Sequence, residues 1–161
     1  MEWEQLYRMQ EELDKYIEEQ RNLREINVFE EKCLALLVEV GELANETRCF
    51  KFWSNKRRSG KGRILEEYVD GIHFILSLGL EKGYRYSGGD KSKHRSTETG
   101  QFNTVFQTCT NFQQHPSPST YDELFASYLQ LGSLLGFTRE DIQQAYMKKN
   151  EVNYTRQEEG Y

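Results

Sequence analysis

Two segments of the chain combine a largely apolar surface with a single acidic stripe. Their acidic residues recur at spacings of three and four: Glu39, Glu42 and Glu46 in LLVEVGELANE, and Glu67 and Asp70 in LEEYVDG. Side chains at these spacings share one face of a helix, within an arc of about 60°. Leu, Val, Ile, Ala and Tyr cover most of the other faces. Because a helix that is apolar almost all round is buried, we expect two central helices, over residues 28–49 and 63–82.

Buried carboxylates that lie close together repel one another and lose their hydration, so they need a cation. Sites built only from oxygen ligands suit hard ions such as Mg²⁺ or Mn²⁺. The alternative is that these residues lie on the solvated faces of amphipathic helices, as single Glu-x-x-Glu pairs usually do. Two acidic pairs on otherwise apolar helices favour the metal site, and the candidate ligands are Glu39, Glu42, Glu67 and Asp70.

The rest of the chain also favours an all-α fold, in a single domain over residues 1–161. The chain is long enough for one hydrophobic core, and its only prolines, Pro116 and Pro118, leave long stretches without a helix breaker. Apolar periodicity predicts further helices over residues 2–24, 102–113, 121–135 and from Thr138 onward. We therefore expect a bundle of five to six helices, with a carboxylate metal cage between two central antiparallel helices. Residues 84–120 are expected to include a variable loop or insertion.

A basic and aromatic segment, residues 48–63, joins the two acidic helices. Its composition, RCFKFWSNKRRSGKGR, is that of a solvated loop or of a loop that brings cations to a metal-bound anion. In the second case Lys51, Lys56, Arg57 and Arg58 are the cations near the anion. Trp53 either packs in the core or forms one wall of a pocket for a planar ligand.

Two side chains differ in character from their surroundings. Gln10 lies within the apolar stripe of the first helix, and a buried amide needs a hydrogen-bond partner. It is either a core glutamine bonded to the backbone or an amide that recognises the edge of a base, and Asp14 either orders the same network or faces water. Phe74 follows Asp70 by one turn, on the acidic side of the helix, where core packing alone does not explain an aromatic ring.

One face of the last helix changes from apolar to polar and cationic toward the C-terminus, through Lys149, Asn153 and Arg156. This face is either a solvated end or a phosphate-binding surface. Carboxylates that hold two or three Mg²⁺ ions, together with Lys and Arg, bind a triphosphate well, since the metal neutralises phosphate charge and activates water. The residues together therefore predict hydrolysis of a nucleoside triphosphate. A phosphate-binding Gly-x4-Gly-Lys-Ser/Thr loop is not present in the sequence.

Composition argues against several other classes of protein. The net charge of −5 argues against a general nucleic-acid binder. The N-terminal segment is too polar for a signal peptide, and no apolar run approaches the roughly 20 residues that cross a bilayer. Cys33, Cys49 and Cys109 have no metal-ligand spacing and are expected to be reduced thiols. We therefore expect a cytoplasmic protein without a membrane partner.

The acidic pairs, separated by a basic aromatic linker, resemble the metal site of the all-α nucleoside triphosphate pyrophosphatases. Two further segments narrow the resemblance to the dimeric all-α dUTPases, which are related to MazG-like proteins. These segments are the Gln-x2-Leu-Asp motif at residues 10–14 and the C-terminal KKNEVNYTRQEEGY. The resemblance covers residues 5–82 and 137–161.

The resemblance implies a homodimer that hydrolyses dUTP with Mg²⁺ as cofactor, and it leaves open whether dUDP is also a substrate. Its products would be dUMP and pyrophosphate, and its action would limit the incorporation of uracil into DNA. It implies these roles: metal binding by Glu39, Glu42, Glu67 and Asp70, with Glu39 as the base for the attacking water; uracil recognition by Gln10 and Asn153; a sugar contact by Phe74; phosphate binding by Lys149, Arg156 and Lys56; and a place in the substrate pocket for Trp53 and Tyr161. Glu46 is expected next to the metal ligands and not among them.

Two other functions stay open at this point. The same chemistry with a different base would make the chain a MazG-like house-cleaning pyrophosphatase that acts on another nucleoside triphosphate. A helical binding protein whose carboxylates hold a structural ion would carry the same acidic stripes without catalysis.

Overall fold

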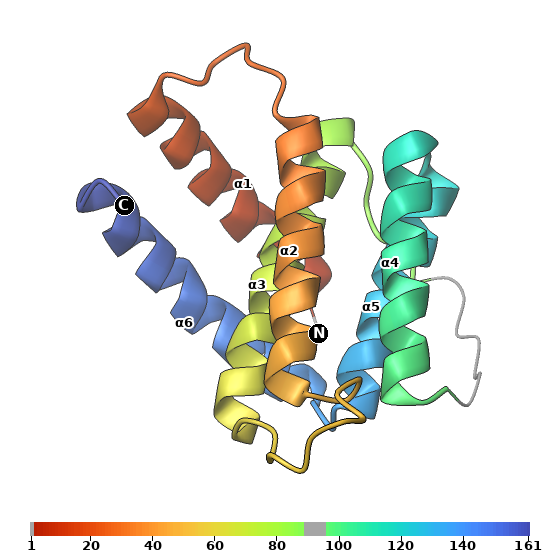
Figure 1. Cartoon of the computed structure of the whole chain (residues 1–161). Helices are drawn as coiled ribbons and strands as arrows, with labels where there is room; N and C mark the ends of the chain where they lie inside the picture. Colours follow the sequence, from red (N-terminus) through yellow and green to blue (C-terminus); the bar gives the residue numbers. More distant parts are fainter. Residues whose placement is uncertain (1, 89–95) are drawn as a thin grey trace.

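The computed structural model describes residues 2–88 and 96–161, which form six helices and no strand (Figure 1). The helices are α1 (Trp3–Arg21), α2 (Phe29–Thr47), α3 (Lys61–Lys82), α4 (Glu98–Gln114), α5 (Pro118–Leu134) and α6 (Arg139–Glu158). The all-α prediction is therefore confirmed. None of the described helices combines the length and the apolar character that crossing a membrane requires.

The helices form a bundle around α2 and α3, which run antiparallel at its centre (Figure 1). The hairpin of α4 and α5 packs on one side of this pair, α4 against α2 and α5 against α3. On the other side α1 and α6 pack against α3 and against each other. Since α3 contacts four of the five other helices, the polar residues on α3 can meet side chains from most of the bundle.

The region expected to include a variable loop is largely helical. α4 begins at Glu98, four residues before the predicted start, because the side chain of Thr97 accepts a hydrogen bond from the backbone N–H of Gly100 at 3.0 Å. α5 begins at Pro118, where a capping box between Ser117 and Thr120 starts the helix. Residues 89–95 of the expected loop lie outside the described residues.

Two buried tyrosines fix the contact between α3 and α5. The hydroxyl of Tyr68 donates to the backbone carbonyl of Tyr128 at 2.9 Å, and the hydroxyl of Tyr128 donates to the carbonyl of Tyr68 at 2.7 Å. The two rings stack with their centroids 4.6 Å apart. A Cβ atom at Gly71 would overlap the Tyr128 hydroxyl, and one at Gly132 would overlap that of Tyr68. Glycine at these two positions therefore makes room for a contact that sets the register of α3.

The expectation that α2 is buried almost all round is wrong. Leu34 is 63% exposed and Val38 is 49% exposed, although Leu36, Val40 and Leu43 are fully buried. The reason is that only α3 and α4 pack against α2, so its remaining apolar face is uncovered in the single chain. Glu39 of the acidic stripe nevertheless faces α3, since one of its carboxylate oxygens lies within 4.8 Å of an oxygen of Glu67 and of one of Asp70.

Candidate active site

Three carboxylates from the two central helices converge at one point. α2 contributes Glu39, α3 contributes Glu67 and Asp70, and one oxygen from each lies within 4.8 Å of the others. The antiparallel packing of α2 against α3 causes this convergence, because it turns the two acidic stripes toward each other. The structure thus brings together three of the four predicted metal ligands. Glu42, the fourth, lies one turn after Glu39 and is exposed.

Burial and mutual repulsion change the ionisation of these carboxyl groups. The pKa of Glu39 is raised from 4.5 to about 7, first by burial and then by the charge of Asp70 and of two other carboxylates. Burial also raises the pKa of Glu67 and that of Asp70. Among the described residues, Glu39 Oε2 and Glu67 Oε2 are buried without a hydrogen-bond partner. An all-oxygen cluster with unpartnered buried atoms fits a hard divalent cation such as Mg²⁺.

Two basic side chains partly neutralise the cluster. Arg63 Nη2 lies 2.6 Å from Glu67 Oε1, and Lys149 Nζ lies 3.0 Å from Asp70 Oδ1. Lys149 is buried and was predicted to bind phosphate. Arg63 was not among the predicted site residues, although its position four residues before Glu67 places both side chains on one face of α3. Both cations are therefore placed to contact an anion that binds at the carboxylates.

Glu46 lies next to this cluster. Its carboxylate accepts a hydrogen bond from the hydroxyl of Ser59, and Arg63 Nε lies 3.4 Å from its other oxygen. The hydrogen bond from Ser59 is the main reason that the pKa of Glu46 is lowered. Glu46 therefore ties the loop after α2 to the end of that helix and orients Arg63.

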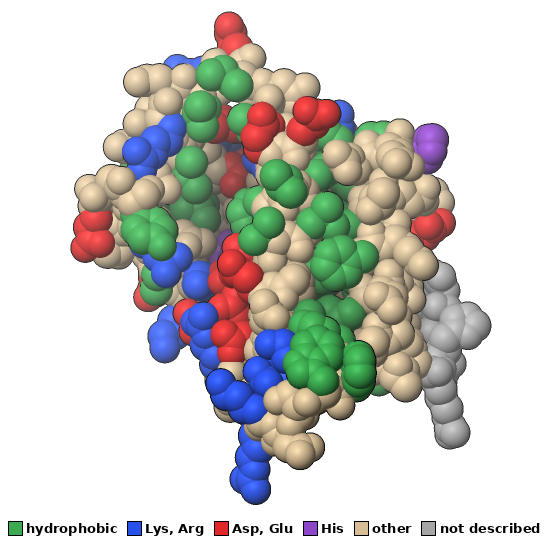
Figure 2. Space-filling view, viewed as in Figure 1, with side chains coloured by type: hydrophobic (Ala, Val, Ile, Leu, Met, Phe, Trp, Pro, Cys, Tyr) green, Lys and Arg blue, Asp and Glu red, His purple; other side chains and the backbone are tan. Residues whose placement is uncertain are grey.

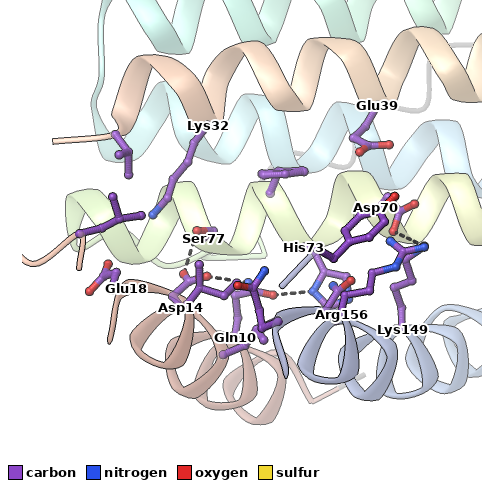
Figure 3. A pocket seen from close by; sticks show the side chains of 18 residues that line it. Gln10, Asp14, Glu18, Lys32, Glu39, Asp70, His73, Ser77, Lys149 and Arg156 are labelled. Carbon is purple, nitrogen blue, oxygen red and sulfur yellow. Dashed lines mark hydrogen bonds and ion pairs between the residues drawn. The ribbon is translucent and has the colours of Figure 1, made fainter. Parts of the chain in front are cut away.

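A pocket of about 330 Å³ opens beside the carboxylates (Figure 3). Its lining includes six of the predicted substrate-binding residues: Gln10, Phe74, Lys149, Asn153, Arg156 and Tyr161. Glu39 and Asp70 lie at one end of the pocket together with Lys149 and Arg156, whereas Asp14 and Ser77 lie toward the other end (Figure 3). The pocket is therefore charged at the end where the carboxylates converge and continues from there toward α1.

A comparison with protein families assigns the chain to one of them. A family model described as dUTPase matches residues 2–161, which is nearly the whole chain. The chain belongs to the dUTPase family. Membership in this family makes it a nucleotide hydrolase of the kind that acts on dUTP. A comparison with curated proteins found no match.

In this member of the dUTPase family Gln10 is bonded to side chains and not to the backbone. It is 4% exposed and lines the pocket, so it is both a core residue and a residue that a ligand can reach. Its amide contacts Asp14, His73 and Tyr146, from three different helices. Asp14 thus orders the network around Gln10 and does not simply face water, which the sequence alone left open.

The loop between α2 and α3 is placed differently from the rest of the predicted site. Trp53 is 65% exposed, and neither it nor Lys56 is among the residues that line the pocket. The guanidinium of Arg58 makes two hydrogen bonds to the carboxylate of Glu98 on α4, at 3.1 and 2.7 Å, so it does not face the carboxylate cluster. Within the single chain, this loop gives the pocket of the dUTPase-family protein no wall.

The C-terminal segment closes the pocket on the side of α6. The guanidinium of Arg156 lies over the ring of Tyr161, 4.8 Å from its centroid. Arg21, at the end of α1, donates a hydrogen bond to the backbone carbonyl of Tyr161 at 2.8 Å. The last residues are therefore held between α1 and α6, which explains why two residues so far along the chain line the same pocket as Gln10.

Several residues that line the pocket were not predicted to bind substrate, and three of them, Lys32, His73 and Ser77, lie on the central helices. His73 and Ser77 lie on α3, three and seven residues after Asp70, and Lys32 lies on α2, seven residues before Glu39. These spacings put each of them on the acidic face of its own helix, and this was the signal in the sequence that marked them. Lys32 is paired with Glu81, 2.7 Å away, at the end of α3.

The raised pKa of Glu39 predicts how the site affects stability without metal. The pKa of Glu39 in the folded state lies near 7, above the usual 4.5. The folded protein is therefore most stable, with respect to this group, below about pH 4.5, where Glu39 is protonated. This contribution to the free energy of unfolding is lost as the pH rises through about 7. Glu39→Gln stays uncharged. In EDTA at about pH 8 it should raise the free energy of unfolding by about 1–3 kcal/mol, with little effect at about pH 4.5, as measured by urea unfolding.

Glu12→Gln provides the control, because Glu12 is an exposed residue of α1 and the same substitution there should change stability little at either pH. Adding Mg²⁺ at about pH 8 should stabilise the wild type more than Glu39→Gln. Equal unfolding free energies of wild type and Glu39→Gln at about pH 8 in EDTA would show that Glu39 does not carry this repulsion.

Proposed function

We propose that this chain hydrolyses dUTP to dUMP and pyrophosphate in a reaction that depends on Mg²⁺. The observation that carries the proposal is a pocket that is lined by Lys149, Arg156 and the buried amide of Gln10 and that opens beside three converging carboxylates. A triphosphate matches the charged end of this pocket, and a base matches the end that contains the amide. The family match supports the same substrate.

The metal would be held by Glu39, Glu67 and Asp70, with Glu42 as an additional ligand on the exposed side. This all-oxygen set suits two or three Mg²⁺ ions, with Mn²⁺ as a substitute. When bound, the metal supplies positive charge that offsets the phosphate oxygens and favours attack by water. Arg63 and Lys149, which contact the same carboxylates, would then be released to bind phosphate.

Glu39 is the group in this cluster that is suited to act as a general base. Its Oε2 atom is buried and has no hydrogen-bond partner among the described residues, so it is free to accept a proton from water. As a bond forms from the water oxygen to one phosphorus of the α–β bridge, the bond from that phosphorus to the bridging oxygen breaks. The proton of the water moves to Glu39, and dUMP and pyrophosphate are released. Lys149 and Arg156 bind the oxygens of the phosphate groups. Lys56, which lies on the loop after α2, is the third phosphate-binding residue in this proposal.

The other end of the pocket recognises the nucleoside. Gln10 and Asn153 contact uracil, and Phe74 lies against the sugar, where a ring offers no partner for a 2′-hydroxyl. Tyr161 covers the pocket from the C-terminal side. Trp53 forms part of the wall of a substrate pocket that a second copy of the chain completes.

Hydrolysis assays test this function directly. The purified protein with Mg²⁺ should convert dUTP to dUMP and pyrophosphate, and should do so faster than it converts dCTP, dTTP or UTP. Glu42→Ala and Asp70→Ala should each lower kcat/KM at least about 100-fold, because each removes a carboxylate ligand, while the helical circular dichroism stays. Equal turnover of dCTP or UTP would instead favour a house-cleaning pyrophosphatase. The absence of any turnover with Mg²⁺ or Mn²⁺ would favour a binding protein.

Phe74 should determine the choice between deoxyribose and ribose. In Phe74→Ala the space beside the sugar opens to water, so a 2′-hydroxyl regains hydrogen-bond partners. The ratio of kcat/KM for dUTP to that for UTP should fall roughly tenfold, which corresponds to the cost of one unmade hydrogen bond. Phe74→Leu keeps an apolar group at this position and should change the ratio less. If the ratio stays at the wild-type value in Phe74→Ala, the sugar does not contact this ring.

We also propose that the protein is a homodimer, with a second copy covering the exposed face of α2 and the loop that follows it. Figure 2 shows hydrophobic side chains gathered along α2 and this loop. The exposed apolar residues there are Leu34, Val38, Phe50, Phe52 and Trp53. A contiguous apolar patch of this kind is typical of an interface. A second copy would also bring Trp53 into an enclosed environment.

The dimer prediction is tested by light scattering on a size-exclusion column. The wild type should have twice the 19.1 kDa mass of the chain. Leu34→Glu places a charge in the interface and should give the monomer mass. The matched control is Leu134→Glu, which introduces the same change at an exposed apolar position on α5 and should leave the dimer intact. A monomeric wild type would contradict the prediction.

A further inference from the structure

A chain of hydrogen bonds joins Gln10 to two other side chains at the end of the pocket away from the carboxylate cluster (Figure 3). Gln10 Nε2 donates to Asp14 Oδ1 at 2.9 Å, within α1. The hydroxyl of Ser77, on α3, donates to the second oxygen of Asp14 at 2.8 Å. Both oxygens of the carboxylate are therefore occupied by donors, one from each helix, which fixes its plane.

The other side of the same amide faces two more groups. The carbonyl oxygen of Gln10 lies 2.7 Å from His73 Nδ1 and accepts a hydrogen bond from the hydroxyl of Tyr146 at 2.9 Å. The rings of His73 and Tyr146 stack, with centroids 4.1 Å apart. Gln10 thus has three partners, which hold the amide plane in place.

One of these partners decides which way the amide is turned. A tyrosine hydroxyl can donate or accept, and so can a neutral imidazole through its choice of tautomer, so both would tolerate an amide turned by 180°. A carboxylate can only accept, so the amide atom that faces Asp14 is the nitrogen. The carbonyl must then face His73, which requires the tautomer with its proton on Nδ1. Burial lowers the pKa of His73 to about 3, so this histidine is neutral and can adopt that tautomer.

The charged form of Asp14 has support of its own. Its pKa is raised, first by burial, and the charge of Lys32 and the hydrogen bonds from Gln10 and Ser77 offset part of this rise. These donors stabilise the carboxylate and make up part of its lost hydration. All the hydrogen bonds of this network therefore have a fixed direction. Ser77 and Gln10 donate to the carboxylate of Asp14, and His73 and Tyr146 donate to the carbonyl of the Gln10 amide.

The remaining group of the amide is its second N–H, which donates to no residue among those described. Gln10 is only 4% exposed, and it lines the pocket. Its second N–H is therefore a buried donor that a ligand can satisfy. A ligand oxygen satisfies this donor, whereas a ligand amino group leaves it unpaired. The pocket therefore offers a hydrogen-bond donor at this position.

We propose that Asp14, oriented by Ser77, is a positioning residue that fixes the Gln10 amide with its N–H toward the pocket and so makes the site select a pyrimidine with oxygen at C4. Uracil and cytosine share the oxygen at C2 and differ at C4, where uracil has a carbonyl and cytosine an amino group. A fixed donor opposite C4 accepts the first and rejects the second. This inference rests on the proposed function, because it assumes a nucleotide in the pocket.

Binding of the product-like nucleotides dUMP and dCMP in the presence of Mg²⁺ tests the inference without relying on turnover. Calorimetric titration should show that the wild type binds dUMP more tightly than dCMP. In Asp14→Asn the residue facing Gln10 can donate as well as accept, so the amide is free to turn. The ratio of the two dissociation constants should then move toward one by about tenfold or more, through weaker dUMP and stronger dCMP binding. A purely structural role would instead weaken both nucleotides equally.

Two further variants make the result decisive. Glu12→Gln is the same kind of substitution on the exposed face of α1 and should keep the wild-type ratio. Ser77→Ala keeps the carboxylate of Asp14 but removes one of its hydrogen-bond donors. It should move the ratio of the dissociation constants in the same direction as Asp14→Asn, by a smaller amount. If Asp14→Asn loses its helical circular dichroism, Ser77→Ala takes its place in the test. An unchanged ratio in a folded Asp14→Asn, or in Ser77→Ala where only that variant folds, overturns the inference.

The same preparations, assayed for dUTP hydrolysis, separate this inference from the proposed function. A wild type that prefers dUMP in binding but does not hydrolyse dUTP would contradict the proposed reaction and leave the role of Asp14 standing. A wild type that hydrolyses dUTP, together with an Asp14→Asn variant that keeps the wild-type binding ratio, would contradict the role of Asp14 and leave the reaction standing.

Discussion

The repulsion among Glu39, Glu67 and Asp70 is the constraint on which the rest of the structure depends. At separations within 4.8 Å, two like charges at a partly shielded site repel each other by on the order of 3 kcal/mol or more. A domain of this kind has a net stability of about 5–15 kcal/mol, so the cluster opposes folding on the same scale. The reciprocal hydrogen bonds of Tyr68 and Tyr128 hold α3 in place from its opposite side. A cation bound at the cluster attracts all three carboxylates and offsets their mutual repulsion. Binding of the cation should therefore raise the free energy of unfolding.

The interior of the bundle is polar as well as apolar, and its polar groups are ordered. Tyr7, Tyr121 and Tyr146 are fully buried, and each hydroxyl has a partner on another helix. Such bonds add little net stability, but a misplaced helix would leave a buried hydroxyl unpaired. They therefore select one packing of α1, α3, α5 and α6. The same packing also orders the pocket, because the partners that orient Gln10 lie on α1, α3 and α6.

The helices and the metal cluster were predictable from the sequence because both follow from local spacing. An acidic stripe at spacings of three and four predicts Glu39, Glu67 and Asp70 on inward faces, and periodicity predicts most helix bounds within a few residues. The exposure of Leu34 was not predictable, since it depends on how many neighbours α2 has. The hydrogen bond between Gln10 and His73 was not predictable either, because it joins residues 63 positions apart.

The spacing of residues on α3 sets the distance between the two ends of the pocket. Asp70, at the carboxylate cluster, and Ser77, in the hydrogen-bond chain with Asp14, are seven residues apart on this helix, with Phe74 between them. Seven residues at 1.5 Å each span about 10 Å. A straight helix maintains this distance without help from loops. An insertion of one residue between Asp70 and Ser77 would rotate Ser77 by about 100° relative to Asp70 and separate the hydrogen-bond chain from the carboxylate cluster.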